Sequence, residues 1–330
     1  MFSPQRRRAL FAIALLPTLL PAIGSGAQHW PSRPIRIVVP YPAGGGPDIS
    51  ARKLAESLGR GLGVPVIVDN KPGASTLLGA QVVAGAAPDG YTVAYITSGL
   101  VTVAAMSKKI DLPKSLQPIT KLNASAFVAV VPASSPYRSL PALMAAARQS
   151  PGKLSYGSAG IGSPAHMAVE HLRLSSPGLV FLHVPYKGAV ESVNALRGGQ
   201  IDFSVLVLST ALPLIKVGTL RALAVTTPAR VPQIADVPTF SEAGVQQYGF
   251  ASWGGFAAPA GTPGPIVQQL FAAIHKAARD PGFVSLQASL GSTTEFSTSP
   301  EAFGKELQAT LAEEEALVKR IGQGGDPDGH

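Results

Sequence analysis

Short β-branched runs alternate with segments of helical spacing along most of the 330-residue chain. The apolar runs predict strands at residues 35–39, 64–68, 92–96, 127–131, 180–184, 201–206 and 220–226. Between them apolar residues recur three and four positions apart, and two longer helices are expected at 266–278 and 300–321. This alternation predicts α/β units with mainly parallel sheets, and the lack of a fixed short repeat argues against a solenoid.

The N-terminal residues have the order of a secretory signal peptide. Arg6, Arg7 and Arg8 precede a charge-free apolar stretch at 9–23, and small residues follow at 25–27. A membrane anchor is the alternative, but the stretch is short for a span and two prolines interrupt it. We therefore expect a signal peptide at 1–27, a mature start at Gln28 and a periplasmic protein, exported by either the general or the twin-arginine route.

Composition excludes several classes of protein. The chain has no cysteine, which removes thiolate catalysis and cysteine-ligated metals. Residues 28–330 suffice for about two domains and hold no second apolar stretch of membrane-spanning length. The formal net charge of +8 comes from scattered basic residues with few aromatics, which argues against nucleic-acid binding and favours a general attraction for anions.

Two distant segments share one pattern. Residues 37–48 and 154–166 each run from a strand into a loop of small residues, and each loop ends at a proline, Pro47 or Pro164, before an amphipathic helix. Proline is favoured at the first helical position, and glycines let backbone N–H groups approach a ligand closely. A helix N-terminus adds unpaired N–H donors and a partial positive charge. Each segment is therefore a candidate anion cradle, and two cradles in two lobes could hold an anion from both sides.

The residues around both cradles carry a family resemblance. The matching segments are Trp30–Ile35, Pro40–Gly45 with Asp48, Asp69–Ala74, Ala87–Thr92, Tyr156–Gly160 with Gly162, Ser163 and His166, His183–Gly188, Gly198–Asp202, Leu220–Thr226, Asp236–Thr239 and Ala257–Pro263. The chain thus resembles the Bug family, the solute receptors of tripartite tricarboxylate transporters. It departs from the family pattern at Tyr41, where phenylalanine is frequent, and at residues 75–77, which lack a further glycine.

The resemblance implies a two-lobed periplasmic binding protein fold of type II-like form. Its lobes would comprise residues 28–124 plus 250–322 and residues 125–249, with crossings near 120–128 and 246–256 and a flexible tail at 323–330. It also implies that loop amides and short side chains hold a ligand carboxylate. The candidate ligand-binding residues are Tyr41, Ala43, Gly44, Gly45, Asp48, Ser98, Ser158, Ala159, Gly162, Ser163, His166, Tyr186 and Lys187.

Single residues leave alternatives open. His166 either contacts the ligand or braces its loop, and Lys187 either steers anions or is an ordinary solvated lysine. Asp48 suits a helix N-terminus structurally, and Asp202 in an apolar strand needs a buried partner. His166 and Glu170 lie one turn apart without a third ligand, so we expect no metal and no cofactor.

We therefore expect a monomeric, non-enzymatic receptor that binds a small organic acid or amino acid and delivers it to a membrane transporter. The alternatives are an exported hydrolase and an envelope adaptor or sensor. No Gly-x-Ser-x-Gly elbow, His-Glu-x-x-His motif, phosphate loop or dinucleotide fingerprint is present, so no residue is assigned to catalysis.

Overall fold

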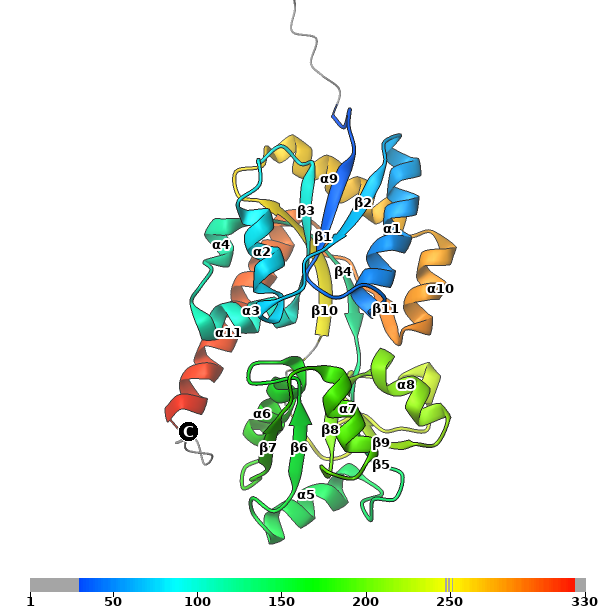
Figure 1. The fold of residues 1–330 in the computed structure, drawn as a ribbon, viewed down its shortest axis with the longest axis vertical. Helices are drawn as coiled ribbons and strands as arrows, with labels where there is room; N and C mark the ends of the chain where they lie inside the picture. Colours follow the sequence, from blue (N-terminus) through cyan, green and yellow to red (C-terminus); the bar gives the residue numbers. More distant parts are fainter. Residues whose placement is uncertain (1–29, 247, 249, 251, 324–330) are drawn as a thin grey trace, which may run out of the picture.

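The computed structural model describes residues 30–246, 248, 250 and 252–323, which form two α/β lobes (Figure 1). The predicted signal peptide at 1–27 lies outside the described residues. So do residues 324–330 of the predicted tail, whereas Gln323 still belongs to the last helix.

Lobe 1 is built on a six-stranded sheet of order β11-β4-β10-β3-β1-β2. Its strands are β1 (Ile35–Val39), β2 (Val66–Asn70), β3 (Thr92–Thr97), β4 (Leu116–Ser125), β10 (Ser252–Pro259) and β11 (Ser292–Thr294). Its helices are α1 (Gly46–Leu62), α2 (Leu77–Ala84), α3 (Ser98–Ser107), α4 (Leu112–Ser115), α9 (Gly264–Ala278), α10 (Pro281–Ser289) and α11 (Pro300–Gln323), with a 3₁₀ turn η1 at Ala74–Thr76.

Lobe 2 contains a three-stranded sheet of order β8-β5-β9 and a two-stranded sheet of β6 and β7. Its strands are β5 (Phe127–Pro132), β6 (Ser155–Ser158), β7 (Leu182–Pro185), β8 (Ser204–Val207) and β9 (Leu220–Val225). Its helices are α5 (Leu140–Gln149), α6 (Pro164–Ser175), α7 (Ala189–Arg197) and α8 (Leu208–Lys216), with a 3₁₀ turn η2 at Pro232–Ile234.

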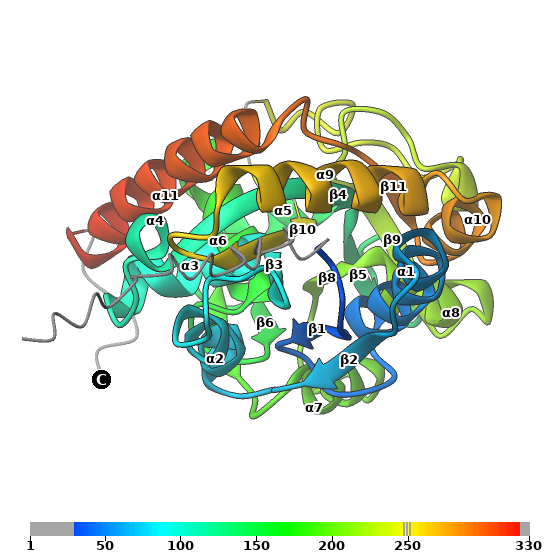
Figure 2. The same ribbon diagram turned by 90° about the horizontal axis from the view of Figure 1, so that it is seen from above.

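The C-terminal helices pack on the first sheet although they follow lobe 2 in the chain. Alternate side chains of β1 face opposite ways, so Ile37 lies in a core with α1 and α9, while Val38 lies in a core with α2, α3 and α11. Viewed from above, α9 and α11 lie beside β4 (Figure 2). Residues 30–120 and 265–320 therefore share two hydrophobic cores.

The chain passes between the lobes twice. Ser125 ends β4 in the first sheet and Phe127 starts β5 in the second. Phe250 packs in the core of lobe 2, and Ser252 begins β10 in lobe 1. The boundaries at 124/125 and 249/250 fall in or beside these passages and stay a prediction.

The six-stranded sheet is mixed and the three-stranded sheet is antiparallel, so the prediction of mainly parallel sheets is wrong in this respect. β1 pairs in parallel with β2 and β3, as β6 does with β7, but the pairs of β10 with β3 and β4, of β11 with β4, and of β5 with β8 and β9 are antiparallel. The cause is the connection: β4 runs toward lobe 2 and β10 runs back, so the two crossing strands must oppose each other. The period of a hydrophobic pattern predicts that a segment is a strand, but it does not predict the direction of that strand relative to its neighbours.

β10 was expected as a crossing segment rather than a strand. Its sequence includes Gly254 and Gly255, which weaken a strand signal. A Cβ at Gly255 would lie 2.6 Å from the carbonyl oxygen of Thr120, so glycine permits the close pairing with β4. Smaller differences affect β2, β7 and β8, which begin at Val66, Leu182 and Ser204, a few residues later than expected. Within residues 30–323, apart from 247, 249 and 251, no helix has both the length and the apolar character needed to cross a bilayer.

Candidate ligand-binding cleft

A cavity of about 510 Å³ lies between the lobes and is lined by both. Lobe 1 contributes residues of the β1–α1 loop, β3, α3, β4, β10, α10 and β11, and lobe 2 contributes residues of β5, the β6–α6 loop, α7, β8 and α8. No Asp, Glu, Lys, Arg or His stands among the described residues that line it. A ligand enclosed here would therefore meet backbone groups, hydroxyls, amides and apolar side chains only.

The lobes touch on both flanks of the cleft. On one flank Gln233 Nε2 of η2 donates a hydrogen bond to the carbonyl oxygen of Ala288 in α10. On the other flank α6 of lobe 2 meets α11 of lobe 1 through His171 and Glu314. A side chain added at Gly46 would lie 3.7 Å from Ser209 Oγ, so α1 and α8 also approach closely. The two lobes are therefore in contact on both sides of the cavity in this structure.

The first cradle is held in shape by Asp48. Its carboxylate accepts hydrogen bonds from the Gly44 N–H at 2.8 Å, from Asn70 Nδ2 at 2.9 Å and from Arg52 Nε at 3.1 Å. Burial raises the pKa of Asp48, but these hydrogen bonds and the Arg52 charge outweigh it and leave the pKa below 3.8. Gly44 has φ +83°, which only glycine adopts without strain. Asp48 thus serves the loop rather than facing the cavity.

The second cradle is braced by two histidines. His166 Nδ1 accepts a hydrogen bond from the Gly162 N–H at 3.2 Å, and Ser158 Oγ lies 2.7 Å from His183 Nε2. Because Nδ1 accepts this hydrogen bond, a neutral His166 carries its proton on Nε2. Ser158 is fully buried and does not line the cavity. Its contact with His183 is therefore structural, and Ser158 is not placed to act as a nucleophile on a substrate in the cleft.

Five helix N-termini converge on the cavity. The first turns of α1, α3, α6, α7 and α8 supply lining residues: Gly46 and Pro47, Ser98 and Gly99, Pro164 and Ala165, Ala189 and Val190, and Ser209 and Thr210. Each N-terminus carries unpaired N–H donors and a partial positive charge. Together they favour an anion in the cavity, although no described residue of its lining has a cationic side chain.

Two serine hydroxyls on the lobe 2 wall are buried and unsatisfied. Ser163 Oγ and Ser192 Oγ find no hydrogen-bond partner among the described residues, although Ser163 is 7 % and Ser192 1 % exposed. Buried polar groups normally have partners. Both residues line the cavity, so a ligand there can supply the missing partner.

The phenols in the wall stay neutral. Burial raises the pKa of Tyr95 to about 12, and it also raises that of Tyr41, against a smaller opposing effect of the hydrogen bond with Thr97 Oγ1 at 2.9 Å. Neither residue places a negative charge in the cavity near neutral pH. Asn123 and Gln287 complete the lobe 1 wall and are hydrogen-bonded to each other at 2.9 Å.

The structure brings five predicted site residues to the cavity wall: Tyr41, Gly45, Ser98, Ala159 and Ser163. The other predicted residues do not line the cavity: Ala43, Gly44, Asp48, Ser158, Gly162, His166, Tyr186 and Lys187. Lys187 is exposed, and its backbone N–H donates to Glu191 at the start of α7. Asp202 accepts from the backbone and hydroxyl of Ser155, consistent with the structural role expected for it.

The sequence predicted a helix at 189–196 but not that its N-terminus lines the cavity, and it did not reveal the N-terminus of α8, Ser192 or the Asn123–Gln287 pair. A signal existed for α7, since Gly188 stands before it and Glu191 lies in its first turn. None existed for Gln287, which is an isolated polar residue in a helix of ordinary composition.

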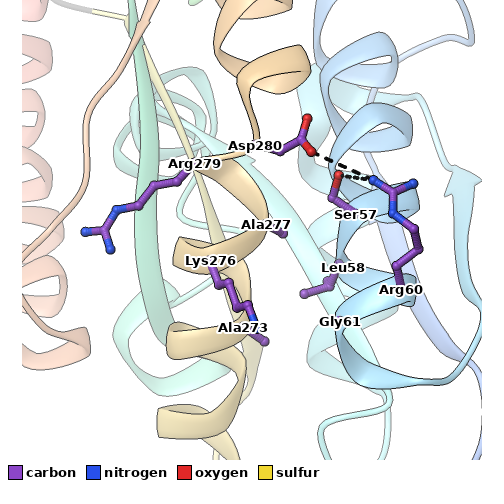
Figure 3. Close-up of a pocket in the computed structure, with 9 residues that line it drawn as sticks. All are labelled: Ser57, Leu58, Arg60, Gly61, Ala273, Lys276, Ala277, Arg279 and Asp280. Carbon is purple, nitrogen blue, oxygen red and sulfur yellow. Dashed lines mark hydrogen bonds and ion pairs between the residues drawn. The ribbon is translucent and has the colours of Figure 1, made fainter.

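A second hollow, of about 380 Å³, lies between α1 and α9 at the far end of α1 from the cleft (Figure 3). Arg60, Lys276 and Arg279 stand around it, and Arg60 reaches Ser57 at 2.9 Å and Asp280 at 3.9 Å. The Arg60 side chain is 64 % exposed, so this basic surface lacks the enclosure of a ligand site.

Comparison with known proteins places the chain in a family. The sequence model described as tripartite tricarboxylate transporter family receptor matches residues 50–323. The chain belongs to this receptor family. A relative from Bordetella pertussis, named as a UPF0065 protein, is 34 % identical over 313 residues, covering 94 % of this chain and 96 % of its own. The family is one of solute receptors and not of enzymes, which confirms the Bug family resemblance and the prediction of a non-enzymatic protein.

Solved structures agree with the family. The periplasmic binding protein BugD superposes with TM-score 0.77 at 32 % identity, covering 89 % of this chain and 99 % of that one. An R. palustris protein solved with adipate gives TM-score 0.78 at 31 % identity (89 % and 98 % covered), and MatC from Rhodopseudomonas palustris with bound malate gives 0.77 at 27 % (88 % and 100 % covered). The two-lobed periplasmic binding protein fold is thereby confirmed.

Proposed function

We propose that this chain is an exported periplasmic receptor that closes on a small carboxylate and delivers it to a membrane transporter of the tripartite tricarboxylate type. The observation that carries the proposal is the cleft itself, where five helix N-termini and two unsatisfied hydroxyls surround a cavity without charged side chains in its described wall. Family membership and the relatives solved with malate and adipate support the same ligand class.

The groups that line the cleft account for the binding of a carboxylate. A carboxylate between the two cradles accepts hydrogen bonds from backbone N–H groups near Gly45 and Pro164 and from the hydroxyls of Ser163 and Ser192. Hydrogen bonds to a charged group contribute about 1.5–3 kcal/mol each. Four or five of them, less the cost of ordering the ligand and the lobes, support an affinity on the order of micromolar.

Closure follows from the division of these donors between lobes. Neither lobe alone surrounds the anion, so a ligand prefers the closed state and shifts the population toward it. The surface made by both closed lobes is then available for recognition by the transporter. We further propose that the receptor acts as a monomer, and that residues 1–27 direct export and are removed, with the mature chain starting at Gln28.

A panel of organic acids tests the ligand class. Each acid is paired with its primary amide, which has the same shape but no charge, and binding is measured by thermal shift and calorimetry on the mature chain. Acids should raise the melting temperature, and by more as their concentration exceeds Kd, while the amides do not. If amides bind as tightly as acids, or no acid binds, the proposal is wrong. Mass spectrometry of the exported protein checks the start at Gln28.

A further inference from the structure

Helix α3 belongs to lobe 1 but lies close to both cradles. Its first turn lines the cavity with Ser98 and Gly99. Directly before it, Thr97 Oγ1 lies 2.9 Å from Oη of Tyr41, which follows β1 in the first cradle. On the side of lobe 2, a Cβ added at Gly99 would lie 3.6 Å from Cγ of Pro164, at the start of α6. A change in the position of α3 would therefore affect both cradles.

The last turn of α3 meets the second cradle at Met106. A Cβ added at Gly162 would lie 2.6 Å from Sδ and 3.4 Å from Cε of Met106, so this side chain occupies the space that any other residue at 162 would need. Gly162 also has φ +76°, which favours glycine. The glycine at 162, which does not line the cavity, is thus required both by its turn and by the approach of Met106.

Packing from both lobes holds Met106 in place. Its side chain packs against the hydrophobic core of lobe 2, and Leu317 of α11 is buried in the same core. Earlier in α11, Phe303 and Leu307 belong to a core of lobe 1. Helices α3 and α11 contact each other, so together they carry apolar side chains from lobe 1 into lobe 2. Met106 is therefore pressed against Gly162 by a packed surface.

The position of Gly162 determines the position of a cavity-lining group. The Gly162 N–H donates to His166 Nδ1 at 3.2 Å, so it is not free to bind a solute. Ser163 comes next, and its N–H donates to the carbonyl oxygen of Gly160 at 3.1 Å. The Ser163 hydroxyl, at the start of α6, lines the cavity and has no hydrogen-bond partner among the described residues. A displacement of Gly162 would move this hydroxyl and the helix N-terminus with it.

The two cradles differ in what holds them in shape. Hydrogen bonds to Asp48 brace the first cradle from within lobe 1, whereas the second cradle has Met106 of the opposite lobe packed on it. Resting on the proposed carboxylate-binding function, we propose that Met106 is a positioning residue for the second cradle. When the lobes touch, it fixes Gly162 and thereby the Ser163 hydroxyl and the α6 N-terminus that receive the carboxylate. Met106 does not line the cavity, so it acts on binding only through this loop.

Two substitutions at Met106 test the proposal. The probe is whichever of malate, adipate and the other acids of the panel gives the unmodified receptor its largest thermal shift. Met106→Ala should lower the calorimetric affinity about tenfold, while Met106→Leu, which keeps the volume, should stay within about twofold. A purely structural contact would change the urea midpoint of Met106→Ala and leave its affinity unaltered, and that result overturns the proposal. If the unmodified receptor binds no acid, the proposed function is overturned as well.

A double-mutant cycle tests the contact itself. Gly162→Ala introduces a strained φ and a collision with Met106, and should lower affinity at least tenfold. Gly178→Ala is the matched control, because Gly178 has φ +83° with nothing within 4 Å of an added Cβ, so it should keep its affinity. In the Met106→Ala background, Gly162→Ala should cost less than about threefold, since the collision is gone. Losses that multiply independently would contradict the coupling, and the Met106 variants decide the matter alone if Gly162→Ala does not fold.

Discussion

Glu314 on α11 and His171 on α6 face each other across the boundary between the lobes, with 3.6 Å between Oε1 and Nε2. Glu314 is 6 % exposed and its other oxygen accepts a hydrogen bond from Thr102 Oγ1 at 3.1 Å. The His171 ring packs against Phe250, in the segment through which the chain returns to lobe 1. This contact therefore joins the two lobes beside a crossing.

Glu314→Ala should shift the ligand-free receptor toward an open form. The Glu314–His171 distance is too long for a normal hydrogen bond, so loss of the contact should remove about 1 kcal/mol from the arrangement in which the lobes touch, which lowers ligand affinity roughly fivefold. Small-angle scattering of the ligand-free variant should give a larger radius of gyration. Glu315→Ala, an exposed neighbour on the same helix, serves as control. Superimposable curves for the variant and the unmodified protein would show that the pair does not govern closure.

Gly45→Val should abolish binding while leaving the fold intact. Gly45 precedes α1 with φ −76° and ψ 163°, which a valine tolerates, and a Cβ there would lie at an ordinary 3.5 Å from the Pro42 carbonyl oxygen. The added side chain instead occupies the cavity beside the N–H donors. Gly264→Val places the same change at the N-terminus of α9, away from the cleft, and should bind normally. Unchanged calorimetric affinity of Gly45→Val would contradict the first cradle.

Ser163→Ala and Ser192→Ala should weaken binding without destabilising the protein. Each hydroxyl lacks a partner among the described residues, so its removal costs the folded state nothing and lowers ligand affinity about tenfold. Ser139→Ala offers the reverse case, because Ser139 Oγ caps α5 by accepting from the Ala142 N–H at 3.3 Å. That variant should lose about 1 kcal/mol of stability and keep its affinity. Chemical denaturation and calorimetry together distinguish the two patterns.

Asp48→Asn should loosen the first cradle and change the acid response. The folded-state pKa of Asp48 lies below 3.8, so its ionised form contributes stability that is fully present above that value and is lost as pH falls through the folded pKa. Asparagine keeps the size but not the charge-assisted bonds to Gly44 and Arg52. We expect a lower melting temperature at pH 7, a smaller further loss below pH 3.8, and about tenfold weaker binding. Glu56→Gln, exposed on the same helix, should match the unmodified protein.

His275 should make stability depend on pH at milder acidity. Burial is the larger cause, and the charge of Arg279 the smaller one, of a pKa of His275 below 6.5. The unfolded chain then binds a proton that the folded chain refuses, so stability falls as pH drops from 6.5 toward the folded pKa, by at most about 1.4 kcal/mol per pH unit. His275→Gln should flatten this slope in urea titrations at several pH values. A slope that persists in the variant would place its origin elsewhere.

Local pattern was sufficient for the elements that position the cradles. The apolar run of β1, the glycines after it and Pro47 each act on their own neighbours, so the strand, loop and helix could be predicted from one stretch of sequence. The same reasoning located Pro164 at the start of α6. Family resemblance added the two-lobed arrangement, which no local pattern contains.

The missed parts depend on residues far apart in the chain. Asn123 and Gln287 are separated by 164 positions, and their hydrogen bond exists only because α10 returns to lobe 1 after the chain has passed through lobe 2. The direction of β4 and β10 likewise follows from that return. Nothing in the sequence singles out Ser192, because a serine in an amphipathic helix is common. Only the structure shows that its buried hydroxyl has no hydrogen-bond partner among the described residues.

In the proposed binding mode main-chain N–H groups hold most of the carboxylate, so point mutations would seldom remove a donor to it. Any residue except proline presents the same amide, so a codon change near the helix starts rarely removes a donor. Changes at Val190, Leu206 or Leu290, in contrast, reshape the space for the rest of the solute in a single step. Duplicated copies of such a gene can therefore diverge to new organic acids while inheriting their charge recognition intact.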